Sequence, residues 1–363
     1  MDLSLSEEQE AVQSLARQIL SDIATHERNR QLEVADEWID RKAWEALADA
    51  GLIGIALPAE HGGGGLGFLE VALVLEEIGR TVAKVPYLAS VVGGALAIAE
   101  FGDASLRAEW LPRLAGGEAI ATAAITEVPG AAATTAVRRG ETWNLTGVVD
   151  FVPAGLDADV LLVAAATGDG ERVFVVDPRA NGVGVVRQDT TTGVPEARIA
   201  FRDAPAIGLL SGDAVADWIR LRLTAGLAAM AAGVCDAALH ITADYTKTRE
   251  QFGRKIASFQ AVSQRVGDIY IDAEAIKLTA LQAAWRISEG LPAAREVVIA
   301  KYWAADGGWR VVYGAQHLHG GMGVDRDYPI HRYFLAAKSI ELTLGGAPAQ
   351  LLALGATLPD AVM

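Results

Sequence analysis

The spacing of apolar residues changes its period twice, near residues 120 and 212. Before the first change the spacing is helical. Ser6 is followed three residues later by Gln9, which is typical of a capping box. The apolar residues of the first predicted helix then follow at helical steps: Val12, Leu15, Ala16, Ile19, Leu20 and Ile23. The same pattern predicts helices over 40–50, 68–79, 87–101 and 105–114, with a glycine-rich loop over 58–67.

Between the two changes, short apolar segments alternate with turns such as Gly168-Asp169-Gly170. Seven short strands so close together are typical of a small antiparallel barrel or sandwich. The predicted strands are 120–126, 142–145, 148–152, 160–166, 172–176, 184–187 and 197–201.

After Gly212 the helical period returns, and it predicts four long helices over 214–246, 258–289, 292–315 and 328–354. Four such helices favour a bundle. We therefore predict an α+β fold with an N-terminal α-helical domain over 1–119, a middle β-barrel domain over 120–211 and a C-terminal four-helix-bundle domain over 212–363. A chain of 363 residues is long enough for two or three domains.

Composition narrows the class of protein. The formal net charge is −15, which repels phosphate backbones, so we expect no nucleic-acid partner. We expect no membrane-spanning helix, because no run of about 18 apolar residues is free of charge. The first residues, MDLSLSEEQE, lack the features of a secretory signal, which favours a cytoplasmic protein. Cys235 is the only cysteine, so an intrachain disulfide or a cysteine zinc site is excluded.

Two motifs stand between the long helices of the C-terminal half. TREQFGRKIASFQ (248–260) brings Arg249, Phe252 and Gln260 into one short segment, and AQHLHGGMGVDRDYPIHRYF (315–334) contains a glycine-rich turn. With PAEHGGGGLGFLEVALVLEEIGR (58–80), ITEVPG (125–130) and the α–β–α order, they make the chain resemble the acyl-CoA dehydrogenases over essentially its whole length.

The resemblance implies an FAD enzyme that oxidises an acyl-CoA thioester between its α and β carbons. In that family a glutamate takes the α proton, and the β hydrogen leaves as hydride to flavin N5. Each flavin lies between two subunits. One subunit's barrel holds the isoalloxazine ring, and the neighbour's bundle holds the diphosphate and adenine.

The resemblance also assigns cofactor-binding residues. Arg249 matches the arginine that pairs with the flavin diphosphate, a task suited to a guanidinium fork. The alternative for Arg249 is a solvated charge at a helix end. Metal binding by the two histidines of the glycine-rich turn is not expected, because no acidic or cysteine ligand accompanies them. The other residues that match the family's flavin contacts are Phe252, Gln260, Gly320, Gly321, Gly323 and either Gln316 or His317, of which His317 aligns with the family glutamine.

Leucine occupies the positions where the family carries its catalytic base. Ala337-Lys338 sets a register that places Leu344 at the usual glutamate. A one-residue slip would place Gly345 there instead, which is no base either. Some members carry the base twenty-six residues before the motif arginine, and that position is Leu223. Leucine accepts no proton, and the loss of a general base costs about 10²–10⁴ in rate. The carboxylates that could replace it are Glu341, Asp217 and Glu127, and we expect each to be a surface charge instead.

The predicted barrel departs from the family as well. Phe151 and Pro153 stand where the family has a tryptophan and a threonine beside the flavin ring. The run that contacts flavin and substrate reads Thr126-Glu127-Val128…Ala131-Ala132-Ala133, with alanine in place of the substrate-contacting serine.

These departures suggest a division of labour. The chain resembles the glutamate-lacking subunit of the bacterial α₂β₂ acyl-CoA dehydrogenases that oxidise steroid side chains. A sister subunit would then supply the base and the barrel that holds the flavin ring. A steroid substrate rests on this resemblance alone, and the electron acceptor is not specified. The alternatives are a homomeric enzyme with a displaced base such as Glu341, and a scaffold subunit without a flavin role.

Overall fold

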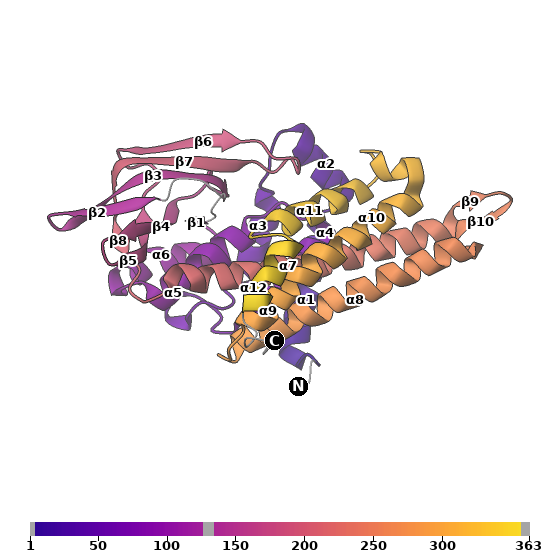
Figure 1. Ribbon diagram of the computed structural model, residues 1–363, viewed down its shortest axis with the longest axis horizontal. Coiled ribbons are helices and arrows are strands. Elements are labelled where there is room, and N and C mark those ends of the chain that lie inside the picture. The colour runs from indigo at the N-terminus through magenta and orange to yellow at the C-terminus, as the bar shows by residue number, and fades with distance from the viewer. Residues whose placement is uncertain (1–3, 126–133, 357–363) are drawn as a thin grey trace, which may run out of the picture. The chain divides into compact units, whose positions relative to one another are not determined.

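The computed structural model describes residues 4–125 and 134–356 (Figure 1). The chain divides into two compact units. The first contains Met1–Gln31, Phe68–Ala83 and Thr224–Met363, and the second contains Leu32–Gly67 and Lys84–Leu223. The first unit is helical, and the second holds the main sheet and the remaining helices. Each unit draws on the N-terminal region, and the boundaries 1–119, 120–211 and 212–363 stay a prediction.

The helices of the first unit follow the predicted order of the N- and C-terminal regions (Figure 1), except that the helix His26–Val34 was not predicted. A short hairpin joins α7 to α8, and a π-helical segment joins α9 to α10. The elements of this unit, two of which (α2 and α7) extend past its limits, are α1 (Glu7–Ile23), α2 (His26–Val34), α4 (Phe68–Thr81), α7 (Val215–Thr248), β9 (Glu250–Gln251), β10 (Arg254–Lys255), η3 (Ile256–Ser258), α8 (Gln260–Ser288), α9 (Ala294–Tyr302), η4 (Trp303–Gly307), α10 (Gly308–His319), η5 (Gly320–Val324), α11 (Ile330–Leu342) and α12 (Ala347–Ala356).

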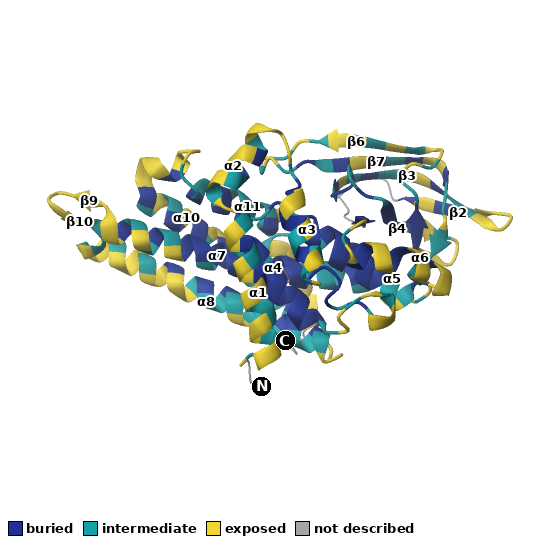
Figure 2. Cartoon of the chain, turned by 180° about the vertical axis from the view of Figure 1, so that it is seen from behind, coloured by how far each residue is buried: buried dark blue, intermediate teal, exposed yellow. Residues whose placement is uncertain are grey.

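The predicted capping box begins α1. The Ser6 side chain accepts from the Gln9 backbone N–H at 3.2 Å, and the Gln9 side chain accepts from the Ser6 N–H at 3.0 Å. Helix α4 is buried along nearly all its length (Figure 2). Its Glu77 is fully buried and accepts from both Arg17 and Arg80, at 2.8 and 2.9 Å. These two arginines compensate the carboxylate for its lost hydration.

Glycine allows α4 and α7 to pack with their backbones in contact. A Cβ at Gly233 would overlap the carbonyl oxygen of Glu76, and a Cβ at Gly79 would overlap that of Met230. Helix α7 is long and apolar enough to suggest a membrane span, but 72% of its most apolar window is buried inside the protein. It is therefore a core helix of the unit.

The last predicted helix, 328–354, is broken, and this prediction was wrong. Helix α11 ends at Leu342 and α12 begins at Ala347. Leu344 and Gly345 between them have φ values of 56° and 91°. Such left-handed backbone cannot continue a right-handed helix, so the chain must turn there. The helical spacing of apolar residues continues through residues 343–346, so the sequence pattern does not show that the helix ends there.

The second unit contains α3 (Arg41–Asp49), the short helix η1 (Ala59–His61) within the predicted glycine loop, the π-helical η2 (Leu88–Ala95), α5 (Leu96–Phe101) and α6 (Ala104–Ala115). Its strands are β1 (Ala121–Ala124), β2 (Thr135–Arg139), β3 (Thr142–Pro153), β4 (Val160–Thr167), β5 (Gly170–Val176), β6 (Val183–Gln188), β7 (Glu196–Pro205) and β8 (Gly208–Leu209).

These eight strands form one sheet in the order β6-β7-β3-β2-β4-β5-β8, with β1 paired to β4. Its buried core includes Leu145, Leu161, Phe174 and Phe201. The sheet is mixed rather than purely antiparallel as predicted, because β1 and β2 both run parallel to β4. All four residues of β1 are buried, which is typical of a parallel strand.

Two strands were not predicted from the sequence, and one strand was wrongly predicted as two. Only Ala136 is buried in β2, and β8 has two residues, so neither gives an alternating apolar signal. The predicted strands 142–145 and 148–152 are one strand, β3, with register shifts at Leu145/Thr146 and Val149/Val152. Bulges of this kind disrupt the two-residue period that marks a continuous strand.

Candidate functional site

The hairpin β9–β10 projects beyond the ends of α7 and α8 (Figure 1). Phe252 and Gly253 form its turn with φ values of 55° and 75°. A two-residue turn with positive φ at both positions fits the twist of a hairpin, and glycine takes it without strain whereas phenylalanine does not. Phe252 is nevertheless 92% exposed. An exposed aromatic side chain on a strained backbone marks this turn as a candidate contact surface for a ligand or partner.

Arg249 lies at the base of this hairpin. Its N–H donates to Tyr245 O at 2.8 Å, and its carbonyl accepts from Ile256 N at 2.9 Å. The other cations of the hairpin are engaged: Lys255 pairs with Glu250 at 2.7 Å, and Arg254 lies 3.9 Å from the ring centre of Phe259. Within residues 4–125 and 134–356, the Arg249 guanidinium has no ion-pair partner. It is exposed and available to an anion.

The glycine turn follows α10 directly. Gly320 has a φ of 58°, and a Cβ at Gly320 or Gly321 would meet no atom within 4 Å. Both residues are exposed. The fold itself therefore gives no packing reason for glycine at Gly321, and the turn offers open backbone to an approaching group.

Tyr245 brings the two motifs together. Its ring stacks on His319 with centres 4.4 Å apart, and its hydroxyl donates to His319 O at 3.4 Å. Tyr245 precedes Arg249 by one helical turn, and His319 precedes Gly320. Two segments about 70 residues apart in sequence are thus held at one end of the helical unit.

The histidines near this turn differ in environment. His319 is buried, and its Nδ1 lies 2.7 Å from Ala315 O, so Nδ1 carries the ring proton. Burial lowers the pKa of His319. His317 is exposed, whereas Gln316 is half-buried and packs against the position where Gly323 lacks a Cβ. Of the two candidates for the flavin contact, His317 is therefore the accessible one. Gln260 is exposed at the first position of α8.

The turn that contains Leu344 is fixed by two buried side chains. Lys301 Nζ donates to Glu341 O at 3.1 Å and to Gly345 O at 2.9 Å. Gln350 Nε2 donates to Leu344 O and to Gly345 O, both at 3.0 Å. Burial lowers the pKa of Lys301 to about 8. Neither Lys301 nor Gln350 was predicted from the sequence, although a single lysine in the apolar segment before Trp303 is a signal for an unusual buried residue.

The two described carboxylates that could replace the missing base are each bound by a basic side chain. Glu341 accepts from Lys338 Nζ at 2.6 Å. Asp217 accepts from Arg220 at 2.6 Å. Glu127 lies outside the described residues, as do Thr126, Val128 and Ala131 to Ala133. Leu223, the other base position, is half-buried on α7, with its Cδ2 3.5 Å from the position a Cβ of Gly93 would take.

The C-terminal end of strand β3 around Phe151 is irregular. Phe151 has a φ of 55°, is 44% exposed and donates its N–H to Gln188 Oε1 at 2.7 Å. Glu196 pairs in register with Pro153 on the neighbouring strand. Burial raises the pKa of Glu196 to about 7, and the sequence gave no signal for this.

Comparison with known proteins identifies the family. A family model described as "Acyl-CoA dehydrogenase, N-terminal domain" matches residues 6–118, and one described as "Acyl-CoA dehydrogenase, C-terminal domain" matches residues 221–358. The Mycobacterium tuberculosis acyl-CoA dehydrogenase FadE27 is 40% identical over 370 residues, covering 99% of each chain. The chain belongs to the acyl-CoA dehydrogenase family.

Solved structures of acyl-CoA dehydrogenases confirm the fold. A chain of the ChsE4-ChsE5 complex from Mycobacterium tuberculosis has a TM-score of 0.95 and 40% identity, covering 99% of this chain and 100% of that one. A chain of the Tcur3481-Tcur3483 steroid ACAD has a TM-score of 0.92 and 44% identity, covering 97% and 98%. The expected N-terminal helical region, central sheet and C-terminal helical region are those of the family.

Acyl-CoA dehydrogenases are FAD-dependent oxidoreductases that act on a CH–CH bond. The residues at the end of the helical unit fit a flavin diphosphate. Arg249 offers a guanidinium with no ion-pair partner among the residues the structure describes, and Gly320 and Gly321 offer a turn with no side chain in the way. The individual flavin contacts stay predictions.

Proposed function

We propose that this chain is the non-catalytic, flavin-site-completing subunit of an α₂β₂ acyl-CoA dehydrogenase. The observation that carries the proposal is Leu344. The register set by Ala337-Lys338 assigns it to the family's glutamate position, and Lys301 and Gln350 hold the turn that contains it. A leucine side chain cannot take a proton there, whereas the Arg249 guanidinium at the proposed flavin end has no ion-pair partner among the described residues.

In this proposal each residue of the chain binds and orients rather than reacts. Arg249 would pair with the FAD diphosphate, with Gln260 and His317 as hydrogen-bond donors and Gly320 and Gly321 as the close backbone surface. When bound, FAD supplies the acceptor for the hydride from the β carbon. The α proton would go to a glutamate of the sister subunit, because neither Leu223 nor Leu344 can accept it.

The proposed substrate is a steroid side-chain CoA thioester, which would place the complex in cytoplasmic β-oxidation and cholesterol catabolism. Its support is that the Tcur3481-Tcur3483 relative is named as a steroid ACAD, and that both solved relatives are complexes of two proteins. The electron acceptor is left open.

The test is to purify this chain alone and together with a glutamate-bearing sister subunit. We expect no dehydrogenation by the lone chain, and two flavins for each four chains in an active complex. A lone homotetramer that holds flavin and turns over would contradict the proposal. In that case Glu341→Gln would abolish turnover if Glu341 were a displaced base, although its carboxylate is held by Lys338.

A further inference from the structure

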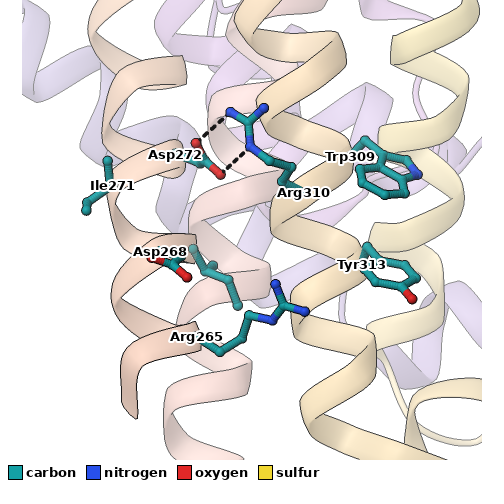
Figure 3. Close-up of a pocket in the computed structure, with 8 residues that line it drawn as sticks. Arg265, Asp268, Ile271, Asp272, Trp309, Arg310 and Tyr313 are labelled. Atoms are coloured by element: carbon teal, nitrogen blue, oxygen red, sulfur yellow. Dashed lines mark hydrogen bonds and ion pairs between the residues drawn. The ribbon is translucent and has the colours of Figure 1, made fainter. Parts of the chain in front are cut away.

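A half-buried arginine usually binds a carboxylate, and Arg310 shows this arrangement in the groove between α8 and α10. Both oxygens of Asp272 accept from it, at 2.7 and 2.8 Å (Figure 3). Arg332, near the start of α11, makes a contact of another kind. It is 7% exposed, and its Nη1 lies 2.6 Å from Nδ1 of His26, the first residue of α2. The second ring nitrogen of His26, Nε2, lies 3.0 Å from the backbone oxygen of Asp327.

These two contacts fix the protonation state of His26. A guanidinium has N–H donors and no acceptor, so Nδ1 of His26 must be the acceptor in its contact with Arg332. The ring proton is therefore on Nε2, which donates to Asp327 O. Only the neutral imidazole satisfies both neighbours. A second proton on Nδ1 would place a donor against a donor and would bring two cations within 2.6 Å of each other.

His26 lies among side chains of both charges. Arg30 binds Asp327 at 3.3 Å and Glu27 at 3.8 Å, so it engages two of the carboxylates that would stabilise an imidazolium. Arg332 opposes protonation, and as a buried side chain it has little room to withdraw. The charged and titratable side chains of the three segments around His26 are Glu27, Arg28, Arg30 and Glu33 of α2, Asp325, Arg326, Asp327 and Tyr328 ahead of α11, and His331, Arg332 and Tyr333 at the start of α11.

The carbonyl that His26 binds belongs to the segment that follows the glycine turn. Asp325 N donates to Met322 O at 3.3 Å, and Asp327 N donates to Asp325 Oδ1 at 2.9 Å. The chain from Met322 to Asp327 is thus a compact series of hydrogen-bonded turns. A displacement of the backbone at Asp327 is therefore passed on to the glycine turn.

The same segment also touches the residue that begins the glycine turn. The ring of Tyr328 packs on His319 with centres 5.2 Å apart, and Tyr245 stacks on His319 at 4.4 Å. His319 directly precedes Gly320, and Tyr245 lies one helical turn before Arg249. The segment is therefore packed against both parts of the proposed flavin site.

We propose that His26 and Arg332 are positioning residues of the glycine turn, and that they make its hold on FAD depend on pH. The inference rests on the proposed function, because it concerns the same turn. With His26 neutral, Arg332 and Asp327 O are both bound and the turn is fixed. When His26 takes up a second proton, its contact with Arg332 is lost, Asp327 O is released and the turn loosens. The contact is thus present at neutral and higher pH and is lost as pH falls.

The experiment measures how tightly the complex of this chain with its glutamate-bearing sister subunit holds FAD, by flavin fluorescence, from about pH 8 to about pH 5.5. The wild-type complex should bind FAD at least about fivefold more weakly at the acid end, because a hydrogen bond that holds the turn is lost. His26→Gln should bind as the wild type does at the alkaline end and keep that affinity on acidification. Its amide oxygen can accept from Arg332, and its amide nitrogen can donate to Asp327 O.

Two further variants complete the comparison. His26→Leu keeps neither contact, so it should bind FAD weakly at every pH. His240→Gln is the matched control, because the His240 side chain is 70% exposed on α7. It should keep the pH profile of the wild type.

Hydrogen exchange of the amides of residues 320–328, measured on the same samples, reports on the turn itself. At about pH 5.5 these amides should exchange faster in the wild type than in His26→Gln, and at about pH 8 equally in both. Equal exchange at both pH values overturns the proposal, as does an equal loss of FAD on acidification in both proteins. Faster exchange in the wild type with unchanged FAD affinity contradicts the flavin role of the turn, which is a failure of the proposed function, and leaves the histidine contact standing.

Discussion

At the scale of single residues, Lys301 is a fully buried lysine. Within residues 4–125 and 134–356 its hydrogen-bond partners are the carbonyl oxygens of Glu341 and Gly345. A neutral amine has two N–H donors and can satisfy both carbonyls without bringing a charge into the interior. The lowered pKa follows from this burial.

Lys301 should therefore give the folding stability a distinct pH dependence. The folded pKa of about 8 lies below the ordinary value of 10.5, so the unfolded chain binds more protons between these pH values. Stability contributed by this residue rises with pH through that window, by up to about 3 kcal/mol. Urea unfolding of the wild type and of Lys301→Met at pH 7.5 and 10.5 measures it. Parallel changes in both proteins would contradict the burial argument.

The pH dependence of the stability that Glu196 contributes has the opposite sign to that of Lys301. Its folded pKa of about 7 lies above the ordinary 4.5, so the folded protein binds more protons between these values. Its contribution is present below pH 4.5 and is lost as pH rises to 7. Glu196→Gln should be more stable than the wild type at pH 8 by about 2 kcal/mol and equal to it at pH 4. Thermal unfolding at the two pH values checks this, and an equal gain at both would refute it.

The match of residues 248–260 to the family motif was sufficient to name Arg249, Phe252 and Gln260 as flavin-site candidates, whose roles stay predictions. Neither this match nor the spacing of residues indicated Lys301 or Glu196. The state of these side chains depends on what surrounds them in three dimensions, and the carbonyls bound by Lys301 lie 40 and 44 residues further along the chain. A local sequence pattern does not show which distant carbonyl groups such a lysine binds.

At the scale of elements, the close contact between the α4 and α7 backbones leads us to expect that replacing Gly233 destabilises the protein. Gly233→Ala places a Cβ on the carbonyl of Glu76, and neither backbone can move without shifting a buried helix. We expect a loss of at least about 3 kcal/mol in the free energy of unfolding. Gly267→Ala on α8 is the control: a Cβ there meets nothing within 4 Å. It should stabilise the protein by up to about 1 kcal/mol. Similar effects for both would contradict the packing.

The helices were predictable because their apolar periodicity is long and regular, as in α7 and α8. The strands of the sheet were less predictable from the sequence. Strand β2 exposes four of its five residues, and β3 contains bulges that break the alternation. The break after α11 was hidden because Leu344 continues the apolar pattern while adopting a left-handed backbone, which only three-dimensional contacts hold in place.

At the scale of the whole molecule, we expect this chain to bind part of an FAD whose ring another chain holds. Arg249→Ala should weaken FAD binding by the complex about 10–100-fold, since it removes charge-assisted hydrogen bonds to phosphate. The flavin absorbance of the purified complex measures this. Arg254→Ala is the matched control, because that guanidinium stacks on Phe259. Equal flavin loss in both variants would mean that the hairpin as a whole, rather than Arg249, holds the cofactor.

The clamped turn at Leu344 has a consequence for how such a subunit can change. Lys301 and Gln350 hold the backbone through carbonyl oxygens and make no use of the leucine side chain. A Leu344→Glu replacement would therefore leave these backbone contacts in place. Under the proposed function it would still not complete the site, because Phe151 and Pro153 stand where the resemblance expects a tryptophan and a threonine beside the flavin ring.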